Sequence, residues 1–522
     1  MASYASTILQ PLDFEKVAWG VSISTIGVAF LVSGRSIVRN LVVDLLSAIC
    51  DWYLQWKFII RNENRTASMP SLPYRWPNGN GDVAKFLQGR EKAEEWLAKY
   101  GSIYRIWSGS TSEVVISDPE HLKVVFKDSD QHLKAINNDS GYLMSQILGQ
   151  CVGLLSGKAW QSLRSQMEVP FSHMAIANDA PIIRQQTIKF VDKLRKKGDF
   201  QHGIFDPARD LSFYPFLVVA TLLYGELDDI DVQWLGKIAP NRQKLFTYVI
   251  KGGLGRFWLS KYLPTNANKL LGEFQQEWRA FNESMYKKAM AGGANAPMTA
   301  LWEQSQRGEM SEVQLLQTLD ESLFANLDVT TGAISWNFIY LASSLQDQTR
   351  LTEEVRREAG ADETSWNAYI ARSDTFLAAC ISESSRLRPV APFSIPQAPP
   401  TDRKVGDWVV SGGTMVIVDT YGLNMRNPFW GNNSHQYMPE RFLGIKASQL
   451  RYNMWRYGFG PRQCMGKYVA DRMVRSIVAL LIRDYQVELQ PQDKGIDYSV
   501  NPDEWITHPD VRLICKERKV AA

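Results

Sequence analysis

The segment from Tyr457 to Gly466, which reads YGFGPRQCMG, constrains this chain more than any other. Gly458 and Gly460 are separated by one residue, and glycine permits the positive φ that a tight loop requires. Cys464 ends the loop just before Met465–Asp484, where apolar residues at spacing four predict a helix. A helix N-terminus offers unpaired N–H groups and positive potential, and both favour a thiolate over a thiol. The loop therefore predicts a cysteine suited to ligation as a thiolate.

This loop resembles the haem-binding signature of the cytochrome P450 family, an aromatic residue followed by GxGxRxCxG. Tyr457 stands where the family usually has Phe. The resemblance implies that Cys464 is the axial thiolate ligand of haem b, whose iron it supplies with electron density. It also implies that Gly458 shapes the loop, that Arg462 pairs with a haem propionate, and that Gly466 lets the helix backbone pass close to the macrocycle. From the residues alone, a glycine-rich helix cap with a buried cysteine is the alternative.

A second motif, Glu383-Ser384-Ser385-Arg386, places an acid and a base on one helix face at i and i+3. Further along, Pro439-Glu440-Arg441-Phe442 resembles the P450 segment whose arginine joins that pair. The resemblance implies a buried charged network of Glu383, Arg386 and Arg441, which is costly if any member is lost. Read alone, the first motif is also typical of ordinary helical ion pairs.

Trp160 and Arg164 are four residues apart, which puts both on one face of a helix. In the family, a WxxxR pair contacts a haem propionate, so the resemblance implies this role here. His132 and Lys134 lie upstream, where a further propionate donor is expected. Many family members carry Arg or His near the position of Gln397, for contact with a propionate. Gln397 can offer the propionate a hydrogen bond but no charge. The alternative for the WxxxR pair is a partly buried Trp beside a surface Arg.

The segment Ala325–Thr331, which reads ANLDVTT, resembles the oxygen-binding motif of the family's long central helix, usually (A/G)Gx(D/E)T. Asp328 matches the acid of that motif. Asn326 and Val329 replace the usual Gly and Thr, and Thr330 comes one residue late. The resemblance implies that Asp328 and Thr330 relay protons during oxygen activation. The alternative is that the threonines only bond to backbone carbonyls of the helix.

Helical patterns dominate beyond about residue 70, and strand-like runs are few. The helical patterns cover Lys85–Tyr100, Pro181–Lys196, Glu312–Leu345 and Met465–Asp484. The strand-like runs cover Ile103–Trp107, Glu113–Ile116, Trp408–Val410 and Thr414–Val418. We therefore predict a mainly α fold with small β-sheets. The resemblance implies the cytochrome P450 fold, in a single catalytic domain over residues 70–522.

Val17–Gly34 is an uncharged, mostly apolar run of 18 residues, at the lower limit for a helix that spans a bilayer. Arg35 and Arg39 follow it, and positive charge after a span favours a cytosolic location for the rest of the chain. We predict an N-terminal segment (1–16), a transmembrane helix (17–34) and a membrane-proximal segment with linker (35–69). Within the last, Leu41–Ile60 is expected along the membrane surface. The predicted location is the endoplasmic reticulum membrane, and the alternative is that both apolar stretches are buried helices.

The net charge of +3 is too small to indicate a nucleic-acid binder. The five cysteines are far apart and form no CxxC, which argues against a disulfide framework or a zinc site. The chain contains no recognisable flavin or nicotinamide domain, so we expect electrons to come from NADPH through a separate cytochrome P450 reductase. Four basic residues near the cysteine are the expected reductase face: Arg462, Lys467, Arg472 and Arg475.

The resemblance as a whole implies a monooxygenase that uses O2 and NADPH-derived electrons to oxidise a small hydrophobic metabolite. Leu450–Tyr457, leading into the cysteine loop, is typical of filamentous-fungal secondary-metabolite enzymes. Among these the chain is most similar to P450s of gliotoxin-type epidithiodiketopiperazine pathways. Two other classes stay open. One is a peroxide-using or rearranging haem enzyme that needs no reductase, which the altered central motif favours. The other is a non-catalytic haem-binding membrane protein.

Overall fold

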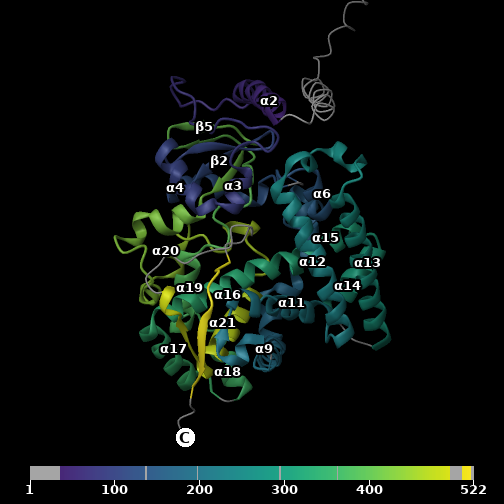
Figure 1. Cartoon of the computed structure of the whole chain (residues 1–522), viewed down its shortest axis with the longest axis vertical. Coiled ribbons are helices and arrows are strands. Elements are labelled where there is room, and N and C mark those ends of the chain that lie inside the picture. The colour runs from purple at the N-terminus through teal and green to yellow at the C-terminus, as the bar shows by residue number, and fades with distance from the viewer. Residues whose placement is uncertain are drawn as a thin grey trace, which may run out of the picture.

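The computed structural model describes residues 36–135, 138–196, 198–292, 296–360, 362–493 and 508–518. Over these ranges the molecule is mainly helical (Figure 1). The helices of the first half are α2 (Ser36–Lys57), α3 (Asp82–Leu87), α4 (Gly89–Tyr100), α5 (Pro119–Phe126), α6 (Tyr142–Leu148), α7 (Gly157–Met167), α8 (His173–Asn178), α9 (Ala180–Leu194), α10 (Pro207–Asp210), α11 (Tyr214–Tyr224) and α12 (Asp229–Lys251). Those of the second half are α13 (Asn266–Gly292), α14 (Pro297–Gln306), α15 (Glu312–Asp320), α16 (Asn326–Ser343), α17 (Leu345–Glu358), α18 (Glu363–Ala371), α19 (Phe376–Leu387), α20 (Ala447–Leu450) and α21 (Lys467–Asp484).

The strands of the described residues form three small sheets, ordered β1-β2-β6, β3-β8-β7 and β4-β5. Their bounds are β1 (Tyr104–Ser108), β2 (Thr111–Ile116), β3 (Ile204–Phe205), β4 (Arg403–Val405), β5 (Trp408–Val410), β6 (Met415–Val418), β7 (Tyr485–Leu489) and β8 (Leu513–Glu517). Strand β2 pairs in parallel with β6, so that Val114 lies opposite Val416. This pairing ties the N-terminal part of the chain to the segment that precedes the cysteine loop.

Helix α16 runs through the middle of the molecule and packs against α11, α19 and α21 (Figure 1). Ile334, Trp336, Phe338 and Leu341 of this helix are all buried. A helix that is apolar on all sides is typically enclosed by the rest of a large protein. The apolar residues at spacing four on α21 are buried as well. Their burial fixes this helix, and the cysteine loop before it, against α16.

The mainly α fold with small sheets is confirmed, but two predicted helices are interrupted. The pattern Lys85–Tyr100 is divided into α3 and α4 at Gln88. The pattern Glu312–Leu345 contains a π-helical segment, Glu321–Ala325, between α15 and α16. Apolar periodicity does not reveal such a segment, because one wider turn shifts the buried face only slightly.

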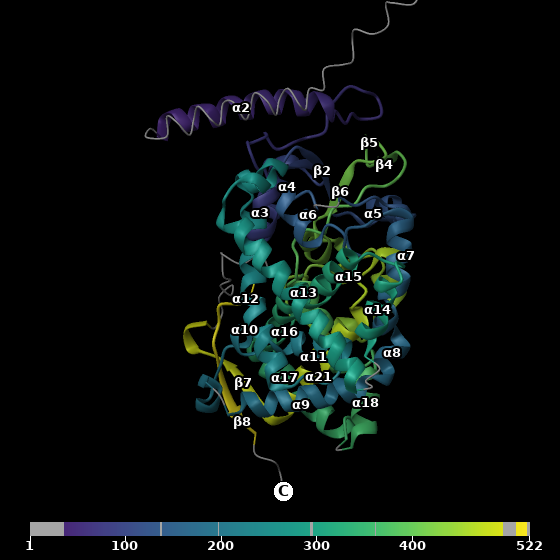
Figure 2. The ribbon, with the colours of Figure 1, turned by 90° about the vertical axis from the view of Figure 1, so that its right-hand side faces the viewer.

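Helix α2 lies across one end of the body in Figure 2. One face is held by the segment after it, where the Asp51 carboxylate accepts a bond from the Tyr74 N–H at 2.7 Å. Exposed apolar side chains follow the helix at spacings of three and four: Leu41, Leu45, Ile49, Trp52 and Trp56. The predicted transmembrane helix 17–34 lies outside the described residues. Among the residues that are described, no helix is long and apolar enough to cross a bilayer.

Candidate active site

Cys464 stands at the end of a loop that two glycines turn. Gly458 and Gly460 have φ of +81° and +70°, in the left-handed region. The Cys464 N–H donates to the carbonyl oxygen of Tyr457 at 2.8 Å, which closes the loop. A Cβ atom on Gly460 would lie 2.1 Å from the hydroxyl oxygen of Ser129, so a larger residue requires Ser129 to move. The loop thus presents an exposed cysteine from a fixed backbone.

Cys464 is exposed at the surface of the loop. The surrounding protein nevertheless removes enough water from the thiol to disfavour its charged form. Burial raises its pKa, and the Glu321 carboxyl adds to this effect. The Gly466 N–H and the cations of Arg164 and Lys467 act in the opposite direction. A Cβ on Gly466 would stand 4.0 Å from the sulfur, so glycine keeps this side of the cysteine open. A metal ion that binds a thiol deprotonates it outright, which overrides the raised pKa.

Arg462, Trp160 and Arg164 all converge on the cysteine loop. The Arg462 guanidinium donates to two backbone carbonyls, one of them that of His132 at 3.0 Å. It also lies over the Trp160 ring, 4.5 Å from the centroid. Arg164, one turn after Trp160 on α7, donates to the carbonyl oxygen of Gln463 at 3.3 Å. The WxxxR pair therefore contacts the loop through both of its side chains.

His132 and Lys134 lie on the segment that pairs with residue 398 beside the loop. His132 is fully buried, with Nε2 3.0 Å from the carbonyl oxygen of Val125. Its Nδ1 has no hydrogen-bond partner among the described residues, and the Gln397 side chain lies beside the ring. Burial lowers the pKa of His132. Burial and the neighbouring Arg462 together lower the pKa of Lys134 to about 7.

These residues fit a haem. The loop presents an exposed cysteine sulfur that could bind the iron. Around it Arg164, Arg462 and Lys134 provide more positive than negative charge, which the two propionate carboxylates of a haem would balance. Because Nε2 of His132 donates to the Val125 carbonyl, its Nδ1 donates to a propionate only when the ring is protonated, a state that a neighbouring carboxylate would favour. Cys464 would hold the iron and the other four residues the propionate edge.

The predicted charged network assembles behind the site. Arg386 donates to both oxygens of Glu383 at 2.7 and 2.8 Å, and Arg441 donates to the same carboxylate at 3.0 Å. Arg386 also donates to the carbonyl oxygen of Asn424 at 3.0 Å and lies over the Trp430 ring. The side chains of Glu383 and Arg386 are both 0% exposed. Every charge in this buried group thus has a charged or polar partner.

The two predicted relay residues differ in their surroundings. The Asp328 carboxylate accepts a bond from Gln243 of α12 at 2.9 Å and lines a cleft of about 510 Å³ on that side of α16. Thr330 and Thr331 are both buried, and the Thr331 hydroxyl donates to the carbonyl oxygen of Leu327 at 2.5 Å. The side chain of Asn326 lies outside the described part of the chain. Asp328 therefore faces α12, and Thr330 stands on a different side of α16.

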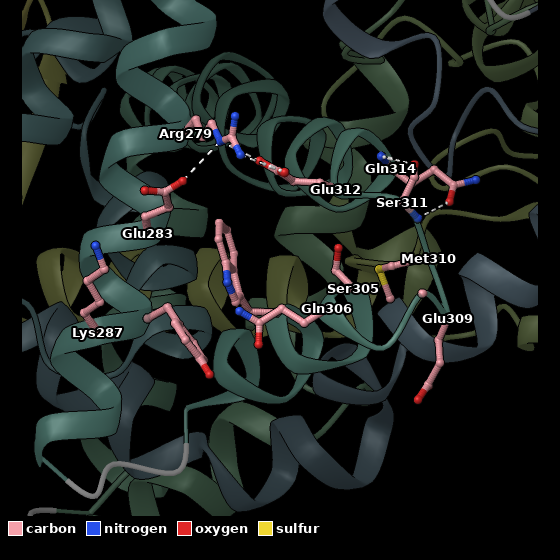
Figure 3. Close-up of a pocket in the computed structure, with 13 residues that line it drawn as sticks. Arg279, Glu283, Lys287, Ser305, Gln306, Glu309, Met310, Ser311, Glu312 and Gln314 are labelled. Atoms are coloured by element: carbon pink, nitrogen blue, oxygen red, sulfur yellow. Dashed lines mark hydrogen bonds and ion pairs between the residues drawn. The ribbon is translucent and has the colours of Figure 1, made fainter.

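A larger cleft, of about 770 Å³, lies among α13, α14 and α15 (Figure 3). Three of its charged groups pair with one another, because Arg279 bonds to Glu283 at 3.1 Å and to Glu312 at 2.7 Å. None of the predicted site residues lines it. Its size alone therefore does not make it the active site.

One part of the expected reductase face is wrong. Arg475 is only 9% exposed and donates to the backbone carbonyls of Ile370 and Arg372 at 3.1 and 2.8 Å. Other parts of the protein cover helix α21 on more than one side. Arg475 lies outside the apolar stripe of this helix, and it packs against the end of α18. Lys467 and Arg472 are half-buried rather than fully solvated.

Glu321 is a residue that sequence reasoning missed. Its carboxyl accepts a hydrogen bond from the Gly153 N–H at 3.1 Å and is close enough to Cys464 to raise the pKa of the thiol. The sequence signal that could have identified Glu321 is an acidic residue in a largely apolar stretch of the central helix. The π-helical turn that carries it has no such signal in the sequence.

Comparison with known proteins identifies the relatives of the chain. The sequence model described as cytochrome P450 matches residues 71–515. Cytochrome P450 monooxygenase aclC of Aspergillus oryzae is 46% identical over 469 residues, covering 90% of this chain and 96% of the relative. Cytochrome P450 monooxygenase asaD of Aspergillus flavus is 44% identical over 474 residues, covering 91% of each. Cytochrome P450 monooxygenase gliC of Aspergillus fumigatus is 40% identical over 500 residues, covering 94% and 97%.

Proposed function

The chain belongs to the cytochrome P450 family, and from that premise we propose that it oxidises a small hydrophobic metabolite with electrons from NADPH–cytochrome P450 reductase. It is a monooxygenase of the type found in fungal secondary metabolism, with haem b bound through a cysteine thiolate. When bound, the haem activates O2 so that one oxygen atom enters the substrate. The observation that carries the proposal is the fixed loop that presents Cys464 among half-buried cations.

The residues of the chain divide this work. Cys464 would bind the iron, and Arg462, Arg164, Lys134 and His132, with Trp160 packed against Arg462, would hold the propionate edge. The Gly458 turn and the open face at Gly466 let the macrocycle approach the loop. On α16, Asp328 and Thr330 are the proposed proton-relay residues, and Asp328 borders the cleft beside α12. The network of Glu383, Arg386 and Arg441 fixes the backbone that precedes the loop.

The proposed substrate class is a diketopiperazine of the gliotoxin-type epidithiodiketopiperazine pathways. Support comes from the similarity of Leu450–Tyr457 to filamentous-fungal secondary-metabolite enzymes and of the chain to P450s of such pathways. A strain that lacks this protein should accumulate an unoxidised cyclic dipeptide, measured by metabolite profiling. Accumulation of a metabolite without a dipeptide ring would contradict the substrate class and leave the monooxygenase activity standing.

The proposed location is the endoplasmic reticulum membrane, with the catalytic domain in the cytosol. Val17–Gly34 supplies the span in this proposal. Helix α2 supports it, because its exposed apolar stripe directly follows that run and includes Trp52 and Trp56, residues suited to the membrane interface. The exposure of these side chains speaks against the alternative that Leu41–Ile60 is a buried helix.

Replacement of the proposed ligand tests the activity directly. Cys464→Ala should abolish the thiolate-type carbon monoxide spectrum of the reduced protein, because no other thiol occupies the loop. Cys50→Ala on α2 is the matched control and should keep that spectrum. An intact thiolate spectrum in Cys464→Ala would refute the proposed ligand. Turnover should require both NADPH and the reductase, whereas full activity with hydrogen peroxide alone would favour the reductase-independent class.

A further inference from the structure

A small cavity of about 130 Å³ lies where α9, α18 and the last turn of α21 meet. Three arginines line it: Arg184 in α9, Arg195 at the end of that helix, and Arg483 of α21. Trp366 of α18 forms a further wall. None of the predicted site residues lines this cavity, and the proposed reaction uses no residue that does.

The positive charge at this cavity exceeds the negative charge that pairs with it. The Asp484 carboxylate bonds to Arg483 at 2.7 Å and to Arg195 at 2.5 Å. The Asp192 carboxylate bonds to Arg195 at 3.3 Å. Among the residues that the structure describes, Arg184 has neither an ion pair nor a hydrogen bond from its side chain. Three guanidinium groups therefore meet two carboxylates, and the cation in excess is Arg184.

The same walls hold buried N–H groups without acceptors. The Nε of Arg184, the Nε of Arg195 and the Nε1 of Trp366 have no hydrogen-bond partner in the described part of the chain. The Trp366 side chain belongs to the core, because this residue is only 3% exposed. Buried donors are normally paired in folded proteins. Unpaired donors and an unpaired cation around one cavity indicate a ligand that is negatively charged and rich in acceptor oxygens.

A phosphate group meets both conditions. Guanidinium groups bind its oxygens with pairs of charge-assisted hydrogen bonds. It offers oxygens in more directions than a planar carboxylate does, which suits donors that come from three different helices. The volume limits the rest of the ligand, because pockets for drug-sized molecules measure about 300–1,000 Å³.

The position of the cavity favours a soluble source for the phosphate over a lipid headgroup. Helices α9 and α18 lie at the end of the molecule opposite α2 (Figures 1 and 2). The apolar stripe that is proposed to meet the membrane is on α2. A lipid surface bound there leaves the cavity facing the aqueous phase.

We propose that this cavity binds the phosphate group of a soluble ligand, which is inorganic phosphate or a small phosphate monoester, with Arg184 as its principal cation. The bound group connects α9, α18 and α21 and so stabilises the helix that follows the cysteine loop. The cavity is separate from the haem site, and the inference does not depend on the proposed reaction.

The competing interpretation is that water molecules fill the cavity and pair with its donors. Arg184 is then an ordinary solvated cation, and phosphate has no more effect than chloride. Calorimetry on the purified holoenzyme separates the two interpretations, in a buffer without phosphate whose ionic strength is held constant with chloride. The probes are inorganic phosphate, phenyl phosphate and benzoate, the last being a carboxylate of similar shape.

The wild type should bind both phosphates saturably and benzoate more weakly. Arg184→Gln should weaken phosphate binding about tenfold, because a hydrogen bond to a charged group is lost. Arg184→Lys should retain part of the binding, and Trp366→Phe, which keeps a ring but removes the N–H, should weaken it less than Arg184→Gln. Lys193→Gln is the matched control, since it removes the same charge from an exposed position of α9 outside the cavity.

Thermal unfolding gives a second readout. Phosphate should raise the unfolding midpoint of the wild type and of Lys193→Gln, but not that of Arg184→Gln. Absence of saturable phosphate binding by the wild type would overturn the inference, as would equal affinity in Arg184→Gln or equal affinity for benzoate. If vesicles that contain phosphatidic acid bind through Arg184 while the soluble phosphates do not bind, the proposed soluble source is wrong.

Discussion

Thr330 and Thr331 are neighbours on α16, and their hydroxyl groups are separated by the rotation of about 100° per residue of a helix. The Thr331 hydroxyl bonds to the carbonyls of Leu327 at 2.5 Å and Ser212 at 3.2 Å. We keep Thr330 as the proposed proton relay, on its place in the family motif and its burial. Thr330→Ala should lower productive turnover by about 100-fold, because a positioned proton donor is lost. The diverted NADPH should appear as hydrogen peroxide, measured as peroxide formed per NADPH consumed.

Thr331→Val is the matched control, since it removes a hydroxyl that the backbone already engages, and it should leave coupling unchanged. If the substrate itself supplies the proton, Thr330→Ala will couple like the wild type. Substrate analogues without the polar group will then uncouple instead. Wild-type coupling in both cases would exclude Thr330 and the substrate as donors.

For single residues, the sequence predicted which ones belong to the site better than it predicted where their side chains point. The spacing of Trp160 and Arg164 sufficed to place both on the face of α7 that contacts the cysteine loop. The match of Asp328 to the family motif did not reveal that its carboxylate faces α12, because one helical position says nothing about the neighbouring helix. Glu321 was missed because its role depends on Gly153, a residue distant in sequence.

Helix α19 owes its position to the pair Glu383 and Arg386. Both side chains are fully buried, so removal of one leaves a charge without its counterion. Arg386→Ala should lower the free energy of unfolding by about 3–5 kcal/mol. The measurement is chemical denaturation together with the haem content of the purified protein. Lys189→Ala, which breaks the exposed ion pair with Glu226, should have little effect on either quantity. A fully haem-loaded, stable Arg386→Ala would show that the network is not needed for the fold.

Helix α2 gives a second prediction at this scale. Trp52 and Trp56 are 71% and 69% exposed on one face, which is the face expected to meet lipid. The double substitution to Glu should weaken binding to anionic lipid vesicles at least tenfold, because the apolar surface is lost and negative charge is added. The matched control adds the same charges at Met174 and Ile230, each 74% exposed and far from α2 in the sequence. Equal loss of vesicle binding in both proteins would refute a specific role for α2.

For the whole molecule, the fold class followed from the ratio of helical to strand-like patterns, and the predicted strands near residues 105, 115, 409 and 416 are present. The parallel pairing of β2 with β6 could not be predicted from these patterns, because it joins segments about 300 residues apart. Alternation of apolar residues identifies a strand but not its partner. The sequence likewise does not show which residues pair with a buried charge, because the partners come from distant parts of the chain.

One such group of buried charges joins four parts of the molecule. Lys85 of α3 bonds to Glu113 of β2 at 2.7 Å and to Asp82 at 3.2 Å. Arg256, from the segment after α12, bonds to Asp82 and to the backbone carbonyl of Asp139. Three carboxyl groups thus face two cations, so the fully ionised group carries excess negative charge. Burial and the neighbouring Glu113 raise the pKa of Asp139 to about 7.

This raised pKa makes stability depend on pH in a defined direction. In the unfolded chain Asp139 ionises near its ordinary value of 3.8, whereas in the folded protein it holds its proton until about pH 7. The folded state is therefore favoured at low pH, and stability falls as pH rises from about 4 to about 7. Since one pKa unit corresponds to about 1.4 kcal/mol, the loss amounts to a few kcal/mol.

Asp139→Asn should remove this loss. The residue has φ of +56°, a conformation that Asn tolerates well, and its carbonyl remains available to Arg256. Thermal unfolding midpoints should be higher for the variant than for the wild type at about pH 8 and should converge as the pH falls below the unfolded-state pKa of 3.8, where the wild-type carboxyl is protonated in both states. Asp192→Asn, at a side chain that is 52% exposed, is the control and should show no such crossover. A variant that differs from the wild type by the same amount at every pH would contradict the titration of Asp139, because only a charge that appears between these pH values can produce a difference that grows with pH.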